Sequence, residues 1–128
     1  MIVGIGVDTV ETERFAVWRT YPRRKLQRIF SEQEIAYCME VAALSAQRFA
    51  VRFAAKEALL KTLAAASIPL PLLFVCRHAS IARDERNHNP YFVLSDELKK
   101  LISKDYAIHV SLSHCRAYAT AMVVIEKI

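Results

Sequence analysis

The chain has 128 residues, 54% of them hydrophobic, so it is long enough for one domain with a real core and too short for two ordinary ones. Charged residues make up 24% and aromatic residues 9%, which excludes a disordered chain. Lysine and arginine outnumber aspartate and glutamate by 18 to 13, and the net charge of +5 favours an anionic partner such as phosphate, nucleic acid or an acidic protein. We therefore expect a single domain over residues 1–128.

Cysteine usage and hydropathy predict where the protein resides. The three cysteines are an odd number without CxxC spacing, which indicates neither a disulfide framework nor a zinc knuckle and is typical of the reducing cytosol. The N-terminal residues lack the basic start and apolar length of a signal peptide. The longest uncharged stretch, residues 62–76, is shorter than the roughly 18 residues of a spanning helix and contains two prolines. We expect a cytoplasmic protein without a membrane span.

The first third of the chain combines a predicted strand with short helices. Residues 2–7 are apolar and contain the only two glycines of the chain, which predicts a buried strand whose glycines permit close backbone packing. The strand is expected to end at Asp8, and either Asp8 or Thr9 is expected to cap a short helix. Ser31 followed by Glu34 forms a capping-box pattern that opens the next helix.

The longest predicted helix spans residues 45–66. Its 3.6-residue periodicity separates a basic edge, formed by Arg48, Arg52 and Lys56, from wide apolar flanks. A helix that is apolar on most sides is expected to be largely buried. Two prolines shortly after residue 66 end it.

The second half of the chain is predicted to contain mainly strands. In chain order these elements are a strand over residues 74–81, a polar turn over 84–89, a return strand over 91–94, a brief helix that starts at Ser95, and a closing hairpin of residues 108–113 and 117–125. Helices grouped early and strands grouped late predict an α+β fold.

Two carboxylates carry the strongest chemical signal. Glu57 shares a face of the long helix with apolar residues, where an ionised carboxylate needs a cation or strong donors. Its local partner is Lys61, but such an i,i+4 pair is worth only about 0.2–0.5 kcal/mol when exposed. Mg²⁺ takes one or two carboxylates and leaves its other positions to water and phosphates, so Glu57 and Asp8 are candidate metal ligands. The alternatives are a helix salt bridge for Glu57 and a helix cap for Asp8.

Basic residues near these carboxylates point to phosphate chemistry. Arg48, Arg52, Lys56 and Lys61 lie within a few turns of one helix, and a metal ion together with such bases is typical of phosphoryl transfer. His114, in the predicted hairpin, could donate a hydrogen bond to a phosphate. An ordinary surface histidine is the alternative.

A one-sided run of positive charge lies between residues 14 and 28. It contains no acid and six bases, namely Arg14, Arg19, Arg23, Arg24, Lys25 and Arg28. Uncompensated like charges repel one another, so the segment fits opposite an anionic surface, with a solvated face as the alternative. Nucleic acid would also serve, and Trp18 and Tyr21 could stack on bases, but the aromatic-rich sheet motif of an RNA-binding module is missing.

Three blocks stand in order along nearly the whole chain: GIGVDTVE at residues 4–11, RFAAKEALLK at 52–61 and HVSLSH at 109–114. Together they resemble the motifs of the holo-acyl-carrier-protein synthases, the small bacterial type of phosphopantetheinyl transferase. The resemblance implies a phosphopantetheinyl transferase fold, in which a long buried helix packs on a mostly antiparallel sheet. It also implies a homotrimer with each active site between neighbouring protomers.

The activity implied by the resemblance is transfer of 4′-phosphopantetheine from coenzyme A to a serine of apo-acyl carrier protein in fatty acid biosynthesis, which releases the adenosine bisphosphate. Asp8 and Glu57 would then be the Mg²⁺ ligands, and Lys61 would neutralise charge on the phosphates. Arg52 and His114 would help to hold the nucleotide end of coenzyme A. The serine proton would pass to Asp8 or to a water on the metal.

Carrier proteins of this type are acidic, so the resemblance gives the basic run a docking partner, and its implied contacts are Arg14, Arg23, Arg24 and Arg28. The chain departs from the family pattern after Lys61, where residues 63–67 read LAAAS instead of a Gly-x-Gly turn. Since alanine resists positive φ, this turn is expected to differ. Two rival hypotheses remain: a basic nucleic-acid-binding module, and an inactive homologue that binds coenzyme A.

Overall fold

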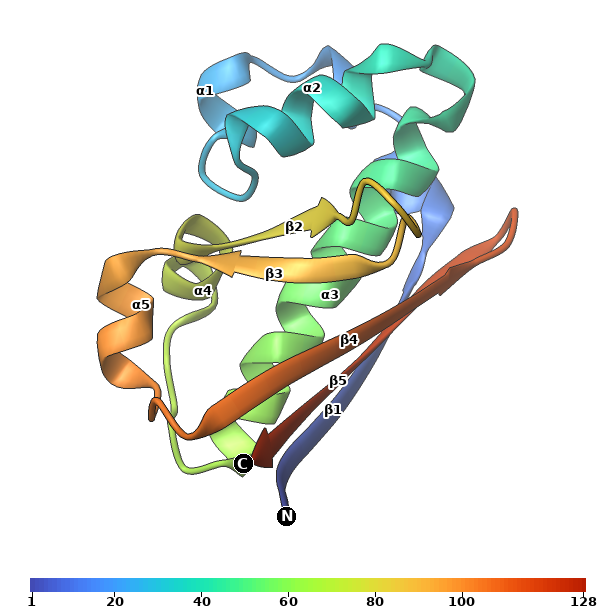
Figure 1. The fold of residues 1–128 in the computed structure, drawn as a ribbon. Helices are drawn as coiled ribbons and strands as arrows, with labels where there is room; N and C mark the ends of the chain where they lie inside the picture. The colour runs from blue at the N-terminus through green and yellow to red at the C-terminus, as the bar shows by residue number, and fades with distance from the viewer.

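A computed structural model describes all 128 residues and shows helices packed on antiparallel sheets, as expected for an α+β fold (Figure 1). The helices and strands are β1 (Ile2–Glu11), α1 (Arg23–Leu26), α2 (Glu32–Glu40), α3 (Ser45–Ala65), α4 (Leu72–His78), β2 (Ala79–Arg83), β3 (Pro90–Leu94), α5 (Asp96–Leu101), β4 (Tyr106–His114) and β5 (Tyr118–Lys127). Short 3₁₀ helices span Thr12–Phe15, Trp18–Thr20 and Ala42–Leu44. No helix is both long enough and apolar enough to cross a bilayer.

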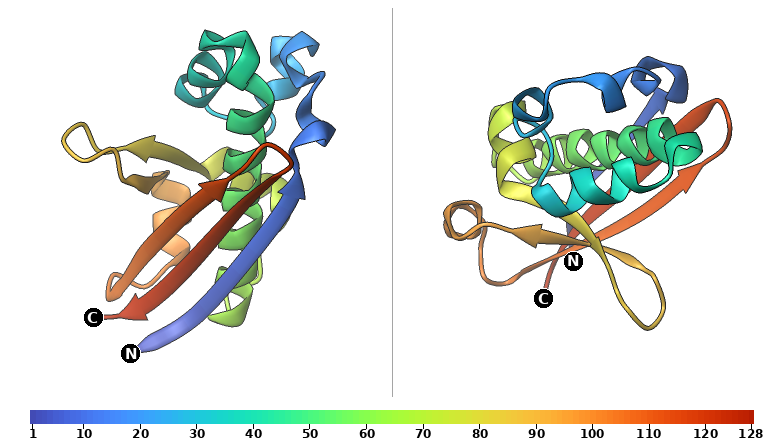
Figure 2. Two further views of the ribbon diagram at one scale, coloured as in Figure 1. Left: turned by 90° about the vertical axis from the view of Figure 1, so that its right-hand side faces the viewer. Right: turned by 90° about the horizontal axis from the view of Figure 1, so that it is seen from above.

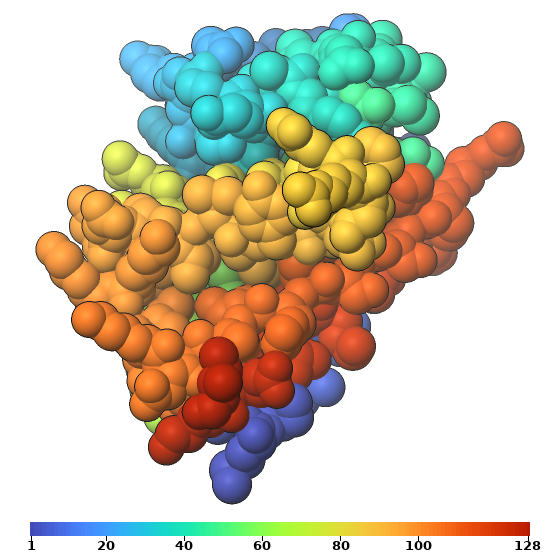
Figure 3. All heavy atoms as spheres, in the orientation of Figure 1, coloured from blue at the N-terminus to red at the C-terminus, as the bar shows by residue number.

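Three strands form an antiparallel sheet in the order β1-β5-β4, and β2 pairs with β3 in a separate two-stranded sheet. Helix α3 lies across one face of the larger sheet (Figure 2). The opposite face is uncovered and carries exposed apolar side chains, with Ile5 60% exposed, Val7 53% exposed and Met122 44% exposed, next to polar ones such as the His109–Glu126 pair. The turn between β4 and β5 projects beyond the body of the molecule (Figure 3).

The two glycines of β1 allow the backbones of β1 and α3 to touch, as predicted. A Cβ atom on Gly6 would lie 2.4 Å from Thr62 Oγ1 and 2.6 Å from the carbonyl oxygen of Ala58. A Cβ atom on Gly4 would lie 2.5 Å from the carbonyl oxygen of Thr62. Since these are mainly backbone atoms, a side chain would push α3 away from the sheet. The contact fixes α3 against β1 two residues before Asp8.

An aromatic cluster holds the basic segment, residues 12–30, against α3. The ring of Trp18 lies at centroid distances of 4.5 Å from Phe15, 6.0 Å from Phe30 and Phe53, and 6.3 Å from Phe49. Phe15, Phe30 and Phe49 are buried, and large buried rings dominate the packing energy of such contacts. The segment is therefore anchored from within while its basic side chains face solvent.

Two local predictions are wrong. Residues 74–81 do not form one strand, because Leu72–His78 is a helix and only Ala79–Arg83 is extended. Pro71 precedes this helix, and burial of the adjacent residues Val75 and Cys76 breaks the alternation of a strand. Neither Asp8 nor Thr9 caps a helix, because β1 continues to Glu11.

The glycine-poor turn after α3 is built around a serine. Ser67 has a φ of 66°, its N–H donates to Ala64 O, and the N–H of Ile68 donates to Leu63 O. This pair of bonds is a Schellman motif, in which glycine is the usual residue at the left-handed position. The predicted helix therefore ends at Ala65, one residue early, and Ser67 takes the positive φ that the alanines avoid.

Candidate functional site

The site begins with two carboxylates that α3 and β1 bring together. Asp8 points from β1 towards α3 and is 8% exposed, and Glu57 lies on α3 at its partly buried edge. Burial and then the negative charge of Asp8 raise the pKa of Glu57, while Lys61 and Arg14 act in the opposite direction. We call Asp8 and Glu57 the acid pair. Two neighbouring acids of this kind are typical of a functional site.

Lys61 balances only part of this charge. Its Nζ donates to Asp8 Oδ1 at 3.0 Å and to the carbonyl oxygen of Val7 at 3.1 Å. The other oxygen, Asp8 Oδ2, is buried and has no hydrogen-bond partner. A buried carboxylate oxygen without a donor is costly, so its natural partner is a cation. The acid pair therefore fits a hard divalent cation that accepts one or two carboxylates.

The alternatives for these residues fail on the geometry. Lys61 pairs with Asp8 across the chain, and no ion pair joins it to Glu57 on the helix. Asp8 lies within β1 and not at a helix start. Glu57 is also less buried than predicted, because the side chain taken fully into the interior is that of its neighbour Lys56.

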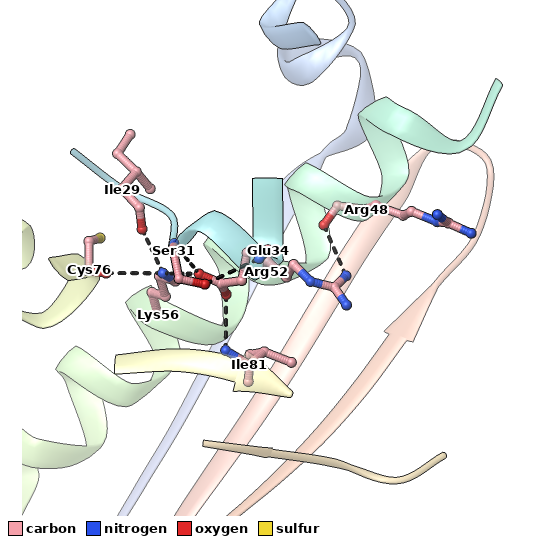
Figure 4. Close-up of polar contacts among 8 residues, drawn as sticks. All are labelled: Ile29, Ser31, Glu34, Arg48, Arg52, Lys56, Cys76 and Ile81. Atoms are coloured by element: carbon pink, nitrogen blue, oxygen red, sulfur yellow. Dashed lines mark hydrogen bonds and ion pairs between the residues drawn. The ribbon is translucent and has the colours of Figure 1, made fainter. Parts of the chain in front are cut away.

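Lys56 does not belong to the basic edge where it was predicted. Its Nζ has no exposed surface and donates to Glu34 Oε1 at 2.7 Å, to Ile29 O at 2.6 Å and to Cys76 O at 3.0 Å (Figure 4). An ammonium group has three donors, and all three are used. Lys56 is therefore unavailable to a phosphate.

The other predicted bases form a separate pocket. Arg48, Arg52, Arg83 and His114 line a cavity of about 190 Å³, and we call them the basic pocket. The guanidinium groups of Arg48 and Arg52 stack over the ring of Tyr37 at 3.9 and 4.3 Å. Burial lowers the pKa of Arg52, and its Nε is buried without a partner. Four cationic or protonatable groups around one cavity suit a phosphate.

Two residues that line this cavity, Arg83 and Tyr37, were not predicted from the sequence. Arg83 ends β2, 31 positions after Arg52, and no spacing rule links it to α3. Tyr37 lies on α2, and its role as a stacking platform depends on how α2 packs against α3. Only the shared helix of Arg48 and Arg52, four residues apart, could be read from the sequence.

Two larger cavities lie elsewhere. They measure about 660 and 510 Å³ and are lined by residues of β3, β4 and α5. Neither is lined by a predicted site residue, so size alone does not locate the chemistry of this protein.

The acid pair and the basic pocket face different sides of α3. Arg52 and Lys61 are nine residues apart, and at about 100° per residue they point in opposite directions. Asp8, Glu57 and Lys61 are absent from the lining of the basic pocket. A single chain therefore brings the acid pair and Lys61 together, and Arg52 and His114 together, but does not join the two groups.

The predicted docking residues differ in whether an ion pair within the chain already engages them. Arg14 is exposed and close enough to Glu57 to lower its pKa. Arg23 is occupied by an ion pair with Glu32, to which its Nε donates at 3.1 Å. Arg24 and Arg28 are exposed and form no ion pair.

Nearly the whole chain is similar to known proteins. It is 38% identical over 126 residues to the holo-[acyl-carrier-protein] synthase of Protochlamydia amoebophila, covering 97% of this chain and 98% of that protein. A Bacillus anthracis holo-(acyl-carrier-protein) synthase solved in complex with CoA (3′,5′-ADP) aligns with a TM-score of 0.74 and 27% identity over 99% of this chain and 98% of that one. The Chronobacterium ammoniagenes ACPS–CoA complex aligns with a TM-score of 0.80 and 25% identity over 97% and 96%. With residues 4–118 matching its family model, the chain belongs to the 4′-phosphopantetheinyl transferase superfamily.

Proposed function

We propose that this protein is a cytosolic, Mg²⁺-dependent holo-acyl-carrier-protein synthase. It transfers 4′-phosphopantetheine from coenzyme A to a serine of apo-acyl carrier protein for fatty acid biosynthesis. The family and the synthase relatives support the reaction. The single observation that carries the metal assignment is Asp8 Oδ2, which is buried without a donor beside a second carboxylate.

The acid pair would hold Mg²⁺, which supplies positive charge to the pyrophosphate of coenzyme A. Lys61 orients Asp8 through Oδ1 and presents an exposed ammonium group to the phosphates. The serine oxygen bonds to the phosphorus that carries pantetheine, and the bond from this phosphorus to the adenosine bisphosphate breaks. The serine proton leaves to Asp8 or to water.

The division of the site supports an active site shared between protomers, as in the homotrimer that the family resemblance implies. Because the acid pair and the basic pocket face opposite sides of α3, one coenzyme A would meet the acid pair of one protomer and the basic pocket of its neighbour. The uncovered face of the larger sheet, with the exposed apolar side chains of Ile5, Val7 and Met122, offers the surface for this contact. The projecting β4–β5 turn follows His114 and could carry it to the adjacent protomer (Figure 3).

The test is incubation of apo-acyl carrier protein with coenzyme A, Mg²⁺ and this protein, followed by mass spectrometry of the carrier. We expect a mass gain equal to phosphopantetheine that disappears when EDTA replaces Mg²⁺. Binding of coenzyme A without this gain would identify an inactive homologue. Salt-sensitive binding to any polynucleotide, with no gain, would instead indicate a nucleic-acid-binding module.

Carrier docking has its own test. Arg24→Glu should raise the KM for the carrier by about 10-fold and leave the KM for coenzyme A nearly unchanged, because a charge at the rim acts on association. The effect should shrink as salt increases. Equal shifts in both KM values would contradict a docking role.

A further inference from the structure

A second lysine–carboxylate pair lies on the other side of α3 from the acid pair, and no step of the reaction uses it. Glu34 and Lys56 have fully buried side chains and form an ion pair of 2.7 Å (Figure 4). Glu34 Oε1 also accepts from the N–H of Ser31 at 2.9 Å, and Oε2 accepts from the N–H of Ile81 at 3.0 Å. Lys56 Nζ also donates to two backbone carbonyl oxygens, so every polar atom of the pair has a hydrogen-bond partner.

The backbone groups bound by the pair belong to segments that surround α3. Ile29 lies near the end of the basic segment, and Ser31 caps α2. Cys76 lies in the last turn of α4, where carbonyl groups lack helical partners and favour a cation. Ile81 belongs to β2. The pair thus ties the basic segment, α2, α4 and β2 to one point on α3.

This point lies opposite the contact between α3 and β1. Ala58 and Thr62 touch Gly6 on the sheet side, and at 100° per residue Lys56 points about 200° and 240° away from them. Glu57 follows Lys56 directly. The helix is therefore held on both sides at the level of Glu57, by backbone contact on one side and by three hydrogen bonds on the other.

We propose that Glu34 and Lys56 are positioning residues that set the rotation of α3 and so place the Glu57 carboxylate against Asp8. The proposal rests on the proposed function, because it assigns the pair a role in the same metal site. Groups that orient metal ligands without touching the metal typically change affinity or activity by about 10- to 100-fold when removed.

The double variant Glu34→Gln/Lys56→Gln tests this role. It removes both charges together, so no lone charge remains buried, and amides keep part of the hydrogen bonding. Measured on folded protein, we expect kcat to fall by about 10- to 100-fold while both KM values stay within about 2-fold. We also expect Mn²⁺ alone, followed by electron paramagnetic resonance, to bind about 10-fold more weakly than to wild type.

A second variant and a control make the outcome decisive. Lys56→Arg keeps the charge, but its planar fork cannot give three bonds from one nitrogen, so the same pattern is expected. Leu98 is the one buried residue of α5, so Leu98→Ala opens a cavity beneath this helix and should lower stability without changing Mn²⁺ affinity or kcat of folded protein. Unchanged Mn²⁺ affinity in both pair variants, or an equal change in Leu98→Ala, would overturn the proposal. Wild-type protein without transferase activity would refute the proposed function instead, while the Mn²⁺ measurement would still test positioning.

Discussion

Helix α3 contributes the lysine of two lysine–carboxylate pairs, which differ in burial and in how many of their polar atoms have partners. Lys56 and Glu34 have side chains with no exposed surface and an N···O distance of 2.7 Å. Lys61 and Asp8 are 3.0 Å apart, with the lysine side chain 53% exposed and the aspartate 9% exposed. The first pair lies inside the fold and the second at its edge.

The two pairs differ more in how many of their polar atoms have hydrogen-bond partners than in their N···O distances. Every polar atom of the Glu34–Lys56 pair has a partner, as a buried network needs if it is to be stable. The Asp8–Lys61 pair leaves Asp8 Oδ2 without a donor and has Glu57 beside it. We therefore interpret the Glu34–Lys56 pair as a structural one, and the Asp8–Lys61 pair as one that has room for a ligand at Asp8 Oδ2.

The largest expected effect compares the two lysines directly. Lys56→Met leaves the Glu34 carboxylate buried without its counter-charge, which should lower the free energy of unfolding by about 3–5 kcal/mol. Lys61→Met leaves Asp8 Oδ1 without its donor but opens it to water, because the ammonium group is half-exposed, and should cost less, about 1–3 kcal/mol. Urea denaturation of both variants measures the difference. Equal losses would remove the structural distinction between the pairs.

Transferase activity should depend on the acid pair, at the edge of the fold, where a substitution costs less stability. Glu57→Gln keeps the size of the side chain and removes the charge that would hold the metal, so kcat should fall by about 10²–10³-fold with the fold intact. Glu97→Gln, on exposed α5, is the matched control and should retain activity. Steady-state transfer to the carrier and circular dichroism report the two properties. A fully active Glu57→Gln protein would exclude this residue from the metal site.

The sequence predicted the residues on the Glu57 side of α3 better than the contacts on its buried side. The reason is how far apart in the chain the interacting residues lie. The cap of α2 by Ser31 and Glu34 involves residues three apart, so it was predictable and is confirmed. The partnership of Glu34 with Lys56 spans 22 residues and depends on how α2 packs on α3. The capping box already explained Glu34, so the sequence held no sign of its second role.

A similar reason explains the errors for Lys56 and α4. Lys56 follows Arg52 at helical spacing, which predicted a shared basic edge, but α2 and α4 cover the side where Lys56 emerges. The apolar run at residues 72–76 has neither clear alternation nor length, so strand and helix patterns compete. The motif-bearing blocks, by contrast, predicted that Asp8 and Glu57 act together, and the fold brings these two carboxylates close to each other.

The contact between α3 and β1 can be broken separately. Gly6→Ala places a methyl group within 2.6 Å of the Ala58 carbonyl oxygen, a backbone atom that cannot turn aside. Overpacking of this kind costs about 1–3 kcal/mol, and it should also weaken Mn²⁺ binding because α3 moves away from Asp8. Urea denaturation and Mn²⁺ titration are the measurements. Gly6→Ala with wild-type values in both would show that the sheet side does not hold the helix.

The smallest effect is a dependence of stability on pH that arises at Glu57, the acid beside the Asp8–Lys61 pair. Burial and the charge of Asp8 raise the pKa of Glu57 above its ordinary value of 4.5, so the folded protein binds this proton more tightly than the unfolded chain does. Stability is then lost as pH rises through the raised pKa, and Glu57→Gln should melt above wild type near about pH 7 but not below about pH 4.

Glu97 gives the control of opposite sign for this measurement. Its pKa is lowered, first by a hydrogen bond from its own backbone N–H and then by one from Ser95, so Glu97→Gln should lose stability at neutral pH. Adding Mg²⁺ should raise the Tm of wild type and abolish the advantage of Glu57→Gln, because a cation relieves the repulsion that the variant removes. Melting curves with EDTA and with Mg²⁺ test both statements. An advantage of Glu57→Gln that persists unchanged in Mg²⁺ would mean that the ion does not bind at the acid pair.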